Sequence, residues 1–307
     1  MAGTRTLITG AAGFLGGHLL SQLNHLGWDV TGTARQAASS QILSCDITDG
    51  ARVEEIVSHI LPEVIFHLAA LTPAAAPNAK ADDYLRVNVG GTLALFEAAR
   101  KFVPGARIVL VTSSAMYGQA DAADGVIRED SALRPVHAYG VSKAAQNLFG
   151  HQHYAQYNLD IVRVCPFNLT GYALPKGLVA SDFAQQIVAL ERSQQEPIIH
   201  VGDLNSKRDF LDVADAVNAL VSLVDKGKAG ESYNLASAQP IQISDILSDL
   251  LSMSKWAIKI QPRPNSMVNR VPIQIGANGK LISATGWQPQ IPIKQSLASV
   301  LAYWREQ

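Results

Sequence analysis

Short apolar runs alternate with longer amphipathic stretches through the first half of the chain. The apolar runs have the composition and length of β-strands and lie at residues 6–10, 29–33, 64–68, 107–112 and 160–164. Between them, apolar residues recur at helical spacing over residues 13–26, 51–60, 82–102 and 139–157. Strands that consist largely of Val, Ile and Leu are typical of a parallel sheet that helices cover on both faces. The pattern therefore predicts a doubly wound α/β fold.

The second half of the chain has a looser rhythm, because prolines separate shorter elements. Helical periodicity continues at residues 181–192, 212–225, 244–252 and 294–304, with Asp212 and Ser244 in the positions of N-caps. We predict a sheet domain over residues 1–165, to which later segments return. Residues 166–307 are expected to form mainly a smaller α/β domain that binds the substrate.

Composition and charge exclude several classes of function. Among 307 residues, 48% are hydrophobic and 17% charged, and 25 Lys and Arg face 26 Asp and Glu, so the basic surplus of a nucleic-acid-binding protein is missing. Cys45 and Cys165 are too few for a disulfide framework and lack metal-ligand spacing. No apolar run approaches the roughly 18 residues that span a bilayer. We expect a cytoplasmic protein without a metal or a membrane anchor.

Three glycines stand between the first predicted strand and the first predicted helix. Gly10, Gly13 and Gly16 form a GxxGxxG motif in the segment TLITGAAGFLGGHLL. A dinucleotide pyrophosphate requires a tight turn, a close backbone approach and a helix N-terminus that faces its negative charge. The motif in this position therefore predicts a dinucleotide site, in preference to a turn that only packs helix on strand.

The residues after the second predicted strand bear on the choice of dinucleotide. NAD sites usually have a carboxylate there for the ribose 2′-hydroxyl, but this chain has VTGTARQ, with Thr33 and Arg35. We therefore favour NADP(H) and leave NAD(H) open. Arg35 could equally be a solvated loop charge, and Asp46 could either meet the adenine or cap its own turn.

A tyrosine, a lysine and two serines are the candidates for chemistry. Tyr139 and Lys143 form a YxxxK motif on one face of a predicted helix, where an ammonium would lower the pKa of the phenol and let it exchange a proton with a substrate. Ser113 and Ser114 end the fourth predicted strand, at the edge where parallel sheets gather their active-site residues. Ser113 is our choice for the hydroxyl that binds a substrate carbonyl, with Ser114 as its competitor.

These motifs, together with HLAA at residues 67–70 and NVGGT at residues 88–92, resemble those of extended short-chain dehydrogenase/reductases that act on nucleotide sugars. The resemblance spans the whole chain and implies a Rossmann domain with a small C-terminal sugar-nucleotide domain. It implies Tyr139 as proton donor, Lys143 as its support and Ser113 as the group that orients the substrate. The implied cofactor-binding residues are Gly10, Gly13, Phe14, Leu15, Gly16, Thr33, Arg35, Asp46, Ile47, Leu68, Ala69, Ala70, Asn88, Tyr139 and Lys143.

The second half resembles most the branch that reduces the 4-keto group of GDP-4-keto-6-deoxy-D-mannose with NAD(P)H, giving GDP-D-rhamnose or GDP-6-deoxy-D-talose. The segments RVCPFNLTG, VASDFAQQI, VGDLNSKRDFLDV and ATGWQPQIPIKQSL carry this likeness. The implied substrate-binding residues are Ser114, Asn168, Lys176, Ser181, Arg208 and Arg263. Cationic groups suit a diphosphate, although each one is more often a solvated surface charge.

Departures from related branches narrow the reaction. Ser114 and Ala115 stand where 4,6-dehydratases of this superfamily have an acid, and Ala115 stands where fucose-synthase relatives have a cysteine. Cys165 replaces an arginine that is usual in the reductase branch, and we expect it to pack rather than react. Two alternatives stay open: a UDP-sugar 4-epimerase with tightly bound NAD, and a non-catalytic nucleotide-binding subunit. The helices at 82–102 and 139–157 are expected to pair two copies into a homodimer.

Overall fold

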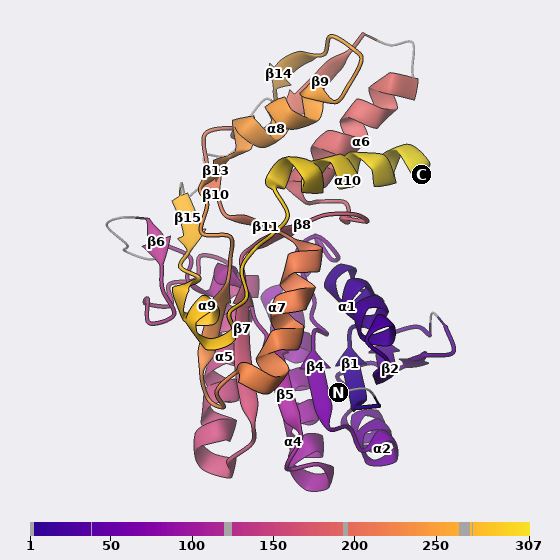
Figure 1. Cartoon of the computed structure of the whole chain (residues 1–307), viewed down its shortest axis with the longest axis vertical. Coiled ribbons are helices and arrows are strands. Elements are labelled where there is room, and N and C mark those ends of the chain that lie inside the picture. Colours follow the sequence, from indigo (N-terminus) through magenta and orange to yellow (C-terminus); the bar gives the residue numbers. More distant parts are fainter. Residues whose placement is uncertain (1–2, 38, 120–124, 193–195, 264–270, 272) are drawn as a thin grey trace.

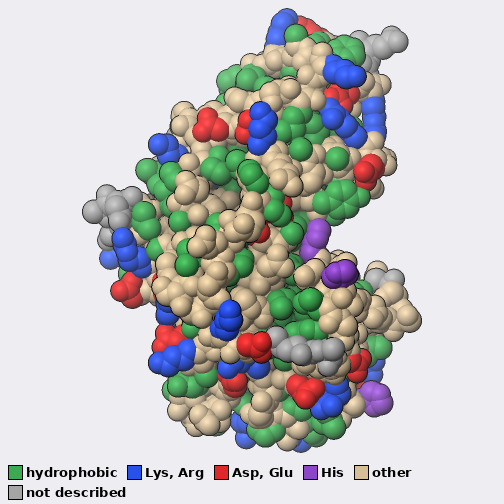
Figure 2. Space-filling view, viewed as in Figure 1, with side chains coloured by type: hydrophobic (Ala, Val, Ile, Leu, Met, Phe, Trp, Pro, Cys, Tyr) green, Lys and Arg blue, Asp and Glu red, His purple; other side chains and the backbone are tan. Residues whose placement is uncertain are grey.

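The computed structural model describes residues 3–37, 39–119, 125–192, 196–263, 271 and 273–307. Figure 1 shows two lobes, with the large parallel sheet and its helices in the lower lobe and α6, α8 and α10 in the upper one. Acidic and basic side chains are interspersed over the face in Figure 2, where the surface is hollowed between the lobes on the side of α1 (Phe14–His25). No helix among the described residues has both the length and the apolarity needed to cross a bilayer.

The described residues of the lower lobe form a seven-stranded sheet, which confirms the predicted α/β fold. Its strand order is β12-β7-β5-β4-β1-β2-β3, and every pairing between neighbours is parallel. Five of these strands match predicted runs within two residues: β1 (Arg5–Thr9), β2 (Asp29–Ala34), β4 (Val64–His67), β5 (Arg107–Val111) and β7 (Ile161–Pro166). The sequence analysis missed β3 (Ile42–Ser44) and β12 (Ser232–Leu235), two short edge strands.

Helices cover the sheet on both faces. On one face, α2 (Gly50–Ile60) and α4 (Gly91–Phe102) bury Val53, Val57 and Leu95 against strand residues such as Ile65 and Ile108. The other face packs against α1, α7 (Val213–Lys226) and α9 (Gly279–Thr285). Because α7, α9 and β12 come from the second half of the chain, both halves build the core of the lower lobe.

The helix predicted over residues 82–102 is divided into three parts. A single turn, α3 (Ala81–Tyr84), leads into a π-helical segment, η1 (Leu85–Gly90), and α4 follows from Gly91. Apolar periodicity does not distinguish these parts, because the π segment continues the same chain direction with one wider turn. Wide turns of this kind often lie at functional sites, and η1 contains Asn88.

The upper lobe has its own apolar core between α6 (Val179–Arg192), α8 (Ile243–Ser252) and α10 (Ile293–Glu306). The strands β9 (Ile198–Val201) and β14 (Lys259–Pro262) pair beside these helices. Asp212 caps α7 as predicted, accepting a hydrogen bond from the Ala214 amide at 2.8 Å. The prediction of Ser244 as an N-cap is wrong: α8 begins at Ile243, and the Ser244 amide already donates to the Leu204 carbonyl.

Short strands join the lobes. In one small sheet β15 (Ile273–Gly276) lies between β6 (Val126–Ile127) and β10 (Lys207–Arg208), with β13 (Ile241–Gln242) at its edge. In another, β8 (Asn168–Thr170) pairs with β11 (Phe210–Asp212). The buried Asp209 stands between β10 and β11 and accepts hydrogen bonds from the amides of Ser237, Ala238 and Gly276. These contacts hold three separate chain segments beside the end of the large sheet.

Candidate functional site

The glycine motif forms the turn from β1 into α1. Gly10 has φ +76°, and a Cβ there would stand 2.8 Å from the Ala69 amide nitrogen, so only glycine fits. The amides of Gly10 and Ala11 both donate to the Thr33 carbonyl, at 2.8 and 3.0 Å. A side chain at Gly16 would strike the Gly10 carbonyl, which explains the close packing of α1 against this turn.

The N-terminus of α1 suits a negatively charged group. Gly13 precedes the helix without a capping side chain, and the first turn contains no acidic residue. Within the described residues, the amides of Phe14 and Leu15 are therefore left to the solvent side of the turn, where the helix dipole favours an anion. The turn therefore offers the backbone donors that a dinucleotide pyrophosphate needs.

The end of β4 lies against the glycine turn. The Leu68 amide donates to the Thr9 carbonyl at 3.1 Å, and the Ala69 amide donates to the Thr9 hydroxyl at 3.2 Å, so residues 68–70 lie beside Gly10. His67 is fully buried between the hydroxyls of Thr9 and Thr92, at 2.7 and 2.8 Å. Burial, and then the charge of Lys143, lower the pKa of His67 to about 3. His67 is therefore a neutral link between β1 and α4.

Arg35 and Asp46 lie at the ends of β2 and β3, and both are exposed. Asp46 accepts hydrogen bonds from the amide and the hydroxyl of Thr48, which lower the pKa of Asp46. Arg35 and Arg86 also lower it through their charges, so both cations lie near this carboxylate. The cap of α2 is Asp49, not Asp46, because Asp49 accepts from the Arg52 amide. Ile47 is buried and packs against Gly91, away from solvent.

The structure brings Ser113, Tyr139 and Lys143 together at the carboxyl ends of β5 and β7. The Ser113 hydroxyl lies close enough to the Tyr139 hydroxyl to act on the pKa of the phenol, which it lowers. The Lys143 ammonium lies 5.9 Å from the centre of the Tyr139 ring and donates to the Val111 carbonyl at 3.1 Å. Ser114 faces another way, since its hydroxyl donates to Gln274 at 3.4 Å and its carbonyl accepts from the same side chain at 3.0 Å. Only Ser113 of the two serines contacts Tyr139.

Close packing between α5 (Ala138–Tyr157) and the short 3-10 turn η2 (Ser114–Met116) makes this contact possible. A Cβ at Gly140 would stand 2.5 Å from the Ala115 carbonyl oxygen, so the helix approaches the turn as near as the backbone allows. His137 caps α5 by accepting a hydrogen bond from the Gly140 amide at 3.0 Å. The position of Tyr139 relative to Ser113 is therefore set by backbone contact.

Burial controls the electrostatics of the pair. The pKa of Tyr139 is raised to about 12, chiefly by burial and against the effect of its hydrogen bond with Ser113. The pKa of Lys143 is lowered to about 7 by burial, partly offset by Cys165. The sequence analysis expected the ammonium to lower the pKa of the phenol. Instead the cost of burying a phenolate dominates, because the ammonium contacts the Val111 carbonyl and not the phenol oxygen.

Asn88 serves the protein's own structure. Its side chain is fully buried, accepts from the Leu71 amide at 2.6 Å and donates to the Leu71 carbonyl and to the Ser142 hydroxyl. Ser142 in turn donates to the Tyr139 carbonyl at 2.8 Å. Asn88 thus fixes α5 to the segment that follows β4.

Cys165 is buried within β7, directly below the catalytic candidates. Hydrogen bonds link its thiol to Thr112 and Tyr117, and burial raises its pKa, so the thiolate is disfavoured. As a thiol in a closed network, Cys165 packs as expected and is a poor nucleophile.

The predicted substrate-binding residues are spread along the junction of the lobes and over the upper lobe. Asn168 is half-buried, and its side-chain amide donates to the Asp209 carbonyl at 2.9 Å. Arg208, which directly precedes Asp209 in the chain, is also half-buried. The Lys176 ammonium is exposed, 5.6 Å from the centre of a Trp304 ring, whereas Ser181 is fully buried and accepts from the Trp304 indole at 3.0 Å. Arg263 is exposed after β14. Ser181 is thus engaged by the protein itself, whereas Lys176 and Arg263 are exposed cations.

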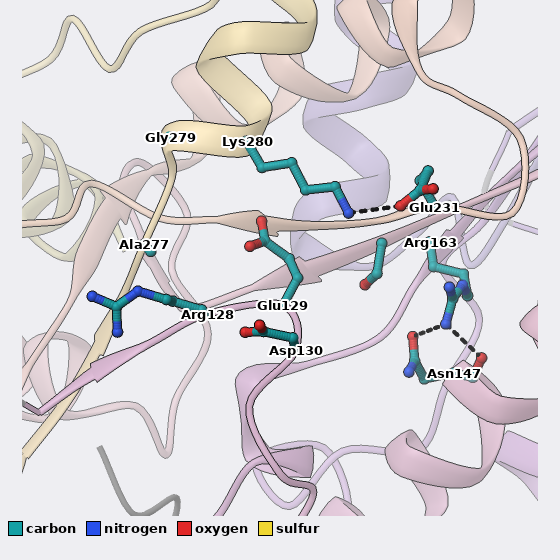
Figure 3. A pocket seen from close by; sticks show the side chains of 10 residues that line it. Arg128, Glu129, Asp130, Asn147, Arg163, Glu231, Ala277, Gly279 and Lys280 are labelled. Carbon is teal, nitrogen blue, oxygen red and sulfur yellow. Dashed lines mark hydrogen bonds and ion pairs between the residues drawn. The ribbon is translucent and has the colours of Figure 1, made fainter. Parts of the chain in front are cut away.

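A cavity of about 570 Å³ lies beside the β7–β12 edge of the sheet, away from the glycine turn. Figure 3 shows its charged lining, in which Lys280 pairs with Glu231 at 2.8 Å and Arg163 donates to Asn147. The paired charges leave the cavity close to neutral. Within the described parts of the chain, no group of three or more His, Cys, Asp or Glu side chains is placed to hold a metal ion.

Comparison with known proteins is consistent with this geometry. Over 305 residues, the chain is 29% identical to the GDP-6-deoxy-D-mannose reductase of Pseudomonas aeruginosa, covering 98% of this chain and 97% of the relative. It is 27% identical over 319 residues to a UDP-glucose 4-epimerase of Mycolicibacterium smegmatis, covering 98% of each. The structure of RMD from Pseudomonas aeruginosa complexed with NADPH superimposes with a TM-score of 0.86 at 28% identity, covering 99% of each chain.

The family model described as "NAD dependent epimerase/dehydratase family" matches residues 6–236, from β1 to the residue after β12. The match includes the glycine turn, the strand-end serines and the YxxxK motif, and it confirms the predicted resemblance. The chain belongs to the NAD dependent epimerase/dehydratase family.

Proposed function

We propose that this protein reduces the 4-keto group of a GDP-linked 4-keto-6-deoxy sugar, with NADPH as the favoured reductant. The proximity of the Tyr139 and Ser113 hydroxyls, at the same end of the parallel sheet as a glycine turn suited to a dinucleotide, carries the proposal. The likeness to the Pseudomonas aeruginosa reductase supports the choice of sugar and nucleotide.

In this proposal Tyr139 is the proton donor. A pKa of about 12 keeps the phenol protonated at neutral pH, so it can give its proton to the ketone oxygen as that oxygen gains negative charge. The Ser113 hydroxyl, which lies beside the phenol, donates a hydrogen bond to the same ketone oxygen and so fixes the orientation of the carbonyl. The bound nicotinamide supplies the hydride that the carbonyl carbon accepts, which completes the two-electron reduction to an alcohol.

Lys143 supports Tyr139 after proton transfer. The phenolate left behind is a buried anion, and an ammonium one helical turn away reduces the cost of that charge. The pKa of about 7 leaves Lys143 partly protonated in the ligand-free protein. A bound anionic ligand would raise this pKa and favour the ammonium when it is needed.

NADPH is preferred because of the charge at the end of β2. A 2′-phosphate placed there would meet the exposed guanidinium of Arg35 and the Thr33–Arg35 backbone, with Arg86 nearby. No carboxylate occupies the position that would bind a ribose 2′-hydroxyl, which weakens the case for NADH.

The nucleotide of the substrate is proposed to lie along the junction of the lobes. Asn168 and Arg208 stand there on β8 and β10, Ser114 borders the catalytic pair, and Lys176 and Arg263 supply exposed cations. Ser181 contributes through its hydrogen bond with Trp304. In this scheme, residues 166–307 form mainly the sugar-nucleotide domain, although β12, α7 and α9 belong to the sheet domain.

The chain is also proposed to form a homodimer through residues 82–102, which include η1 and α4, and through α5. Leu85, Val141 and Leu148 are large apolar residues on η1 and α5 that are between 47% and 58% exposed. Burying such side chains between two copies would stabilise the pair. Light scattering after size-exclusion chromatography should give twice the mass of the chain, and a monomer would contradict the proposal.

The experiment combines the protein with GDP-4-keto-6-deoxymannose and either NADPH or NADH, follows nicotinamide absorbance, and identifies the product sugar by NMR. We expect stoichiometric oxidation, faster with NADPH, and a GDP-6-deoxyhexose product. Tyr139→Phe is the matched control and should lose at least a hundredfold in kcat. No oxidation with either cofactor would refute the reductase.

A 4-epimerase is the second candidate, because a UDP-glucose 4-epimerase is similar over the full chain. The same three residues would serve it, but an epimerase regenerates its nicotinamide in each cycle. Interconversion of UDP-glucose and UDP-galactose without net oxidation or reduction of added nicotinamide would favour this alternative.

A further inference from the structure

The Tyr117 hydroxyl lies in a buried network that the proposed reaction does not use. It donates to the Asn234 side-chain oxygen at 2.9 Å, and a hydrogen bond also links it to the Cys165 thiol. Tyr117 and Asn234 are each 0% exposed although 117 residues separate them in the chain. A buried hydrogen bond between such distant segments fixes their relative position, because breaking it leaves polar groups without water.

Asn234 is itself held rigidly. Its side-chain amide nitrogen donates to the Ile127 carbonyl at 3.0 Å, which turns the side-chain oxygen toward Tyr117. Its backbone amide donates to the Glu129 carboxylate at 2.9 Å. Figure 3 shows Glu129 among the side chains that line the charged cavity. Asn234 therefore presents a fixed acceptor on β12.

Tyr117 ends the 3-10 turn η2, which Ser113 begins. Ser113 is the N-cap of η2 and accepts from the Ala115 amide at 3.2 Å, and Tyr117 is its C-cap. A single 3-10 turn has little stability of its own, so its ends decide where it lies. One end follows β5, inside the sheet. At the other end, the Tyr117 ring stacks on Phe167 at 6.5 Å, and its hydroxyl bonds to Asn234.

The contact between Ser113 and Tyr139 depends on where this turn lies. The Ala115 carbonyl on η2 abuts Gly140 on α5, so a shift of the turn changes the distance between the serine and tyrosine hydroxyls. Displacements of about 1 Å in a reacting group can lower rates by up to a hundredfold.

We propose that Tyr117 is a positioning residue: anchored by Asn234, it holds η2 so that the Ser113 hydroxyl stays on Tyr139. The inference rests on the proposed function, in which Ser113 orients a substrate ketone. Removal of the Tyr117 hydroxyl should therefore impair the reaction only as long as Ser113 has a hydroxyl to place.

The test is a double-mutant cycle on kcat with Tyr117→Phe, Ser113→Ala and the double variant, using the keto sugar and NADPH. Tyr117→Phe should lower kcat about tenfold while the Kd for NADPH, measured by fluorescence, changes less than twofold. In the Ser113→Ala background, Tyr117→Phe should have almost no further effect. Equal effects of Tyr117→Phe in both backgrounds would overturn the proposal, because they would indicate a structural role independent of Ser113.

Tyr233→Phe is the matched control. Tyr233 is Asn234's neighbour on β12, is 3% exposed, and its hydroxyl accepts from the Lys228 amide at 3.1 Å, far from η2 along the chain. Its loss should lower thermal stability by a similar amount and leave kcat unchanged. An equal fall in kcat would count against a specific role for Tyr117.

Hydrogen exchange separates this inference from the proposed function. If the wild-type protein leaves the keto sugar unreduced, the proposed function fails. The effect of the hydrogen bond between Tyr117 and Asn234 on the position of η2 can still be measured. The amides of Ala115 and Met116, which donate to Ser113, should exchange faster in Tyr117→Phe than in Tyr233→Phe. Equal exchange rates of these amides in the two variants would refute the claim that Tyr117 holds η2 in place.

Discussion

Lys143 and Tyr139 share one face of α5, and burial acts on both by favouring the uncharged form. The phenol keeps its proton because its pKa rises to about 12, and the amine gives up its proton near neutrality because its pKa falls to about 7. In water both groups would keep their protons at neutral pH. Tyr139 therefore keeps its proton at neutral pH, and of the two groups it is Lys143 that changes charge near pH 7.

The depressed pKa of Lys143 predicts a pH-dependent stability. The unfolded chain keeps this proton up to about pH 10.5, whereas the folded protein releases it above about pH 7. Because the unfolded state binds more protons between these values, the wild-type free energy of unfolding should rise with pH relative to that of Lys143→Met, by ~3 kcal/mol from pH 7 to 9.5. Urea unfolding of both proteins measures the difference, and parallel curves would contradict the prediction.

The positive charge of Arg35 is expected to make the protein prefer NADPH over NADH. Arg35→Ala should raise the KM for NADPH at least tenfold, because charge-assisted hydrogen bonds to a phosphate contribute about 1.5 to 3 kcal/mol. The KM for NADH should change little, since NADH has no 2′-phosphate. Steady-state kinetics with both cofactors provides the measurement. A matching loss with NADH would mean that Arg35 binds the adenine and does not select the phosphate.

At the scale of elements, the approach of α5 to η2 decides the geometry of the site. Gly140→Ala places a Cβ against the Ala115 carbonyl and the Pro135 ring, and backbone gives way less readily than side chains. We expect a loss of about 1 to 3 kcal/mol in stability and at least a tenfold fall in kcat.

Gly150→Ala is the control on the same helix. Its added Cβ would meet Leu110 and Arg163 side-chain atoms at 2.8 and 3.1 Å, more than two turns from Gly140. This variant should lose stability but keep kcat within about twofold, since the contact of α5 with η2 is untouched. If both variants lose kcat equally, α5 transmits strain along its length, and the local explanation is wrong.

Periodicity predicted the elements whose burial is regular, and missed those fixed by single contacts. The strands β4 and β5 consist mostly of apolar residues that are buried on both faces, which a sequence reveals directly. The π turn at η1 contains Asn88, whose buried side chain donates to Ser142 on α5, and β12 is recognisable only once β7 is beside it. Apolar patterns do not encode such partners.

The same distinction holds for the candidate site. Ser113 and Tyr139 were predicted together because strand ends and YxxxK motifs have a fixed place in this fold, and the structure brings them into contact. Tyr117 was missed because it resembles an ordinary apolar residue, and Asn234 was missed because its strand, β12, was not predicted. Their only signal, a tyrosine four residues beyond Ser113 in SSAMYG, gives no indication of a partner more than 100 residues away.

At the scale of the whole molecule, the two halves of the chain are interlocked. Arg107 on β5 donates to the Leu223, Val224 and Gly227 carbonyls at the end of α7 and pairs with Asp160 at 2.9 Å. Leu220 and Leu223 on α7 are fully buried against the sheet. The sheet domain therefore depends on residues well beyond its predicted boundary at 165.

A chain ending at residue 165 should consequently fail to fold. It would lose β12, so β7 would become an open edge, and it would lose α7 and α9, so one apolar face of the sheet would meet water. We expect aggregation, or a compact state that binds the dye ANS and gives no near-ultraviolet circular dichroism, while the full chain unfolds cooperatively. A soluble 1–165 monomer that melts cooperatively and binds NADPH would show that the sheet domain is independent. In that case the later segments would serve the substrate alone, and the hydrogen bonds of Arg107 would contribute little to the fold.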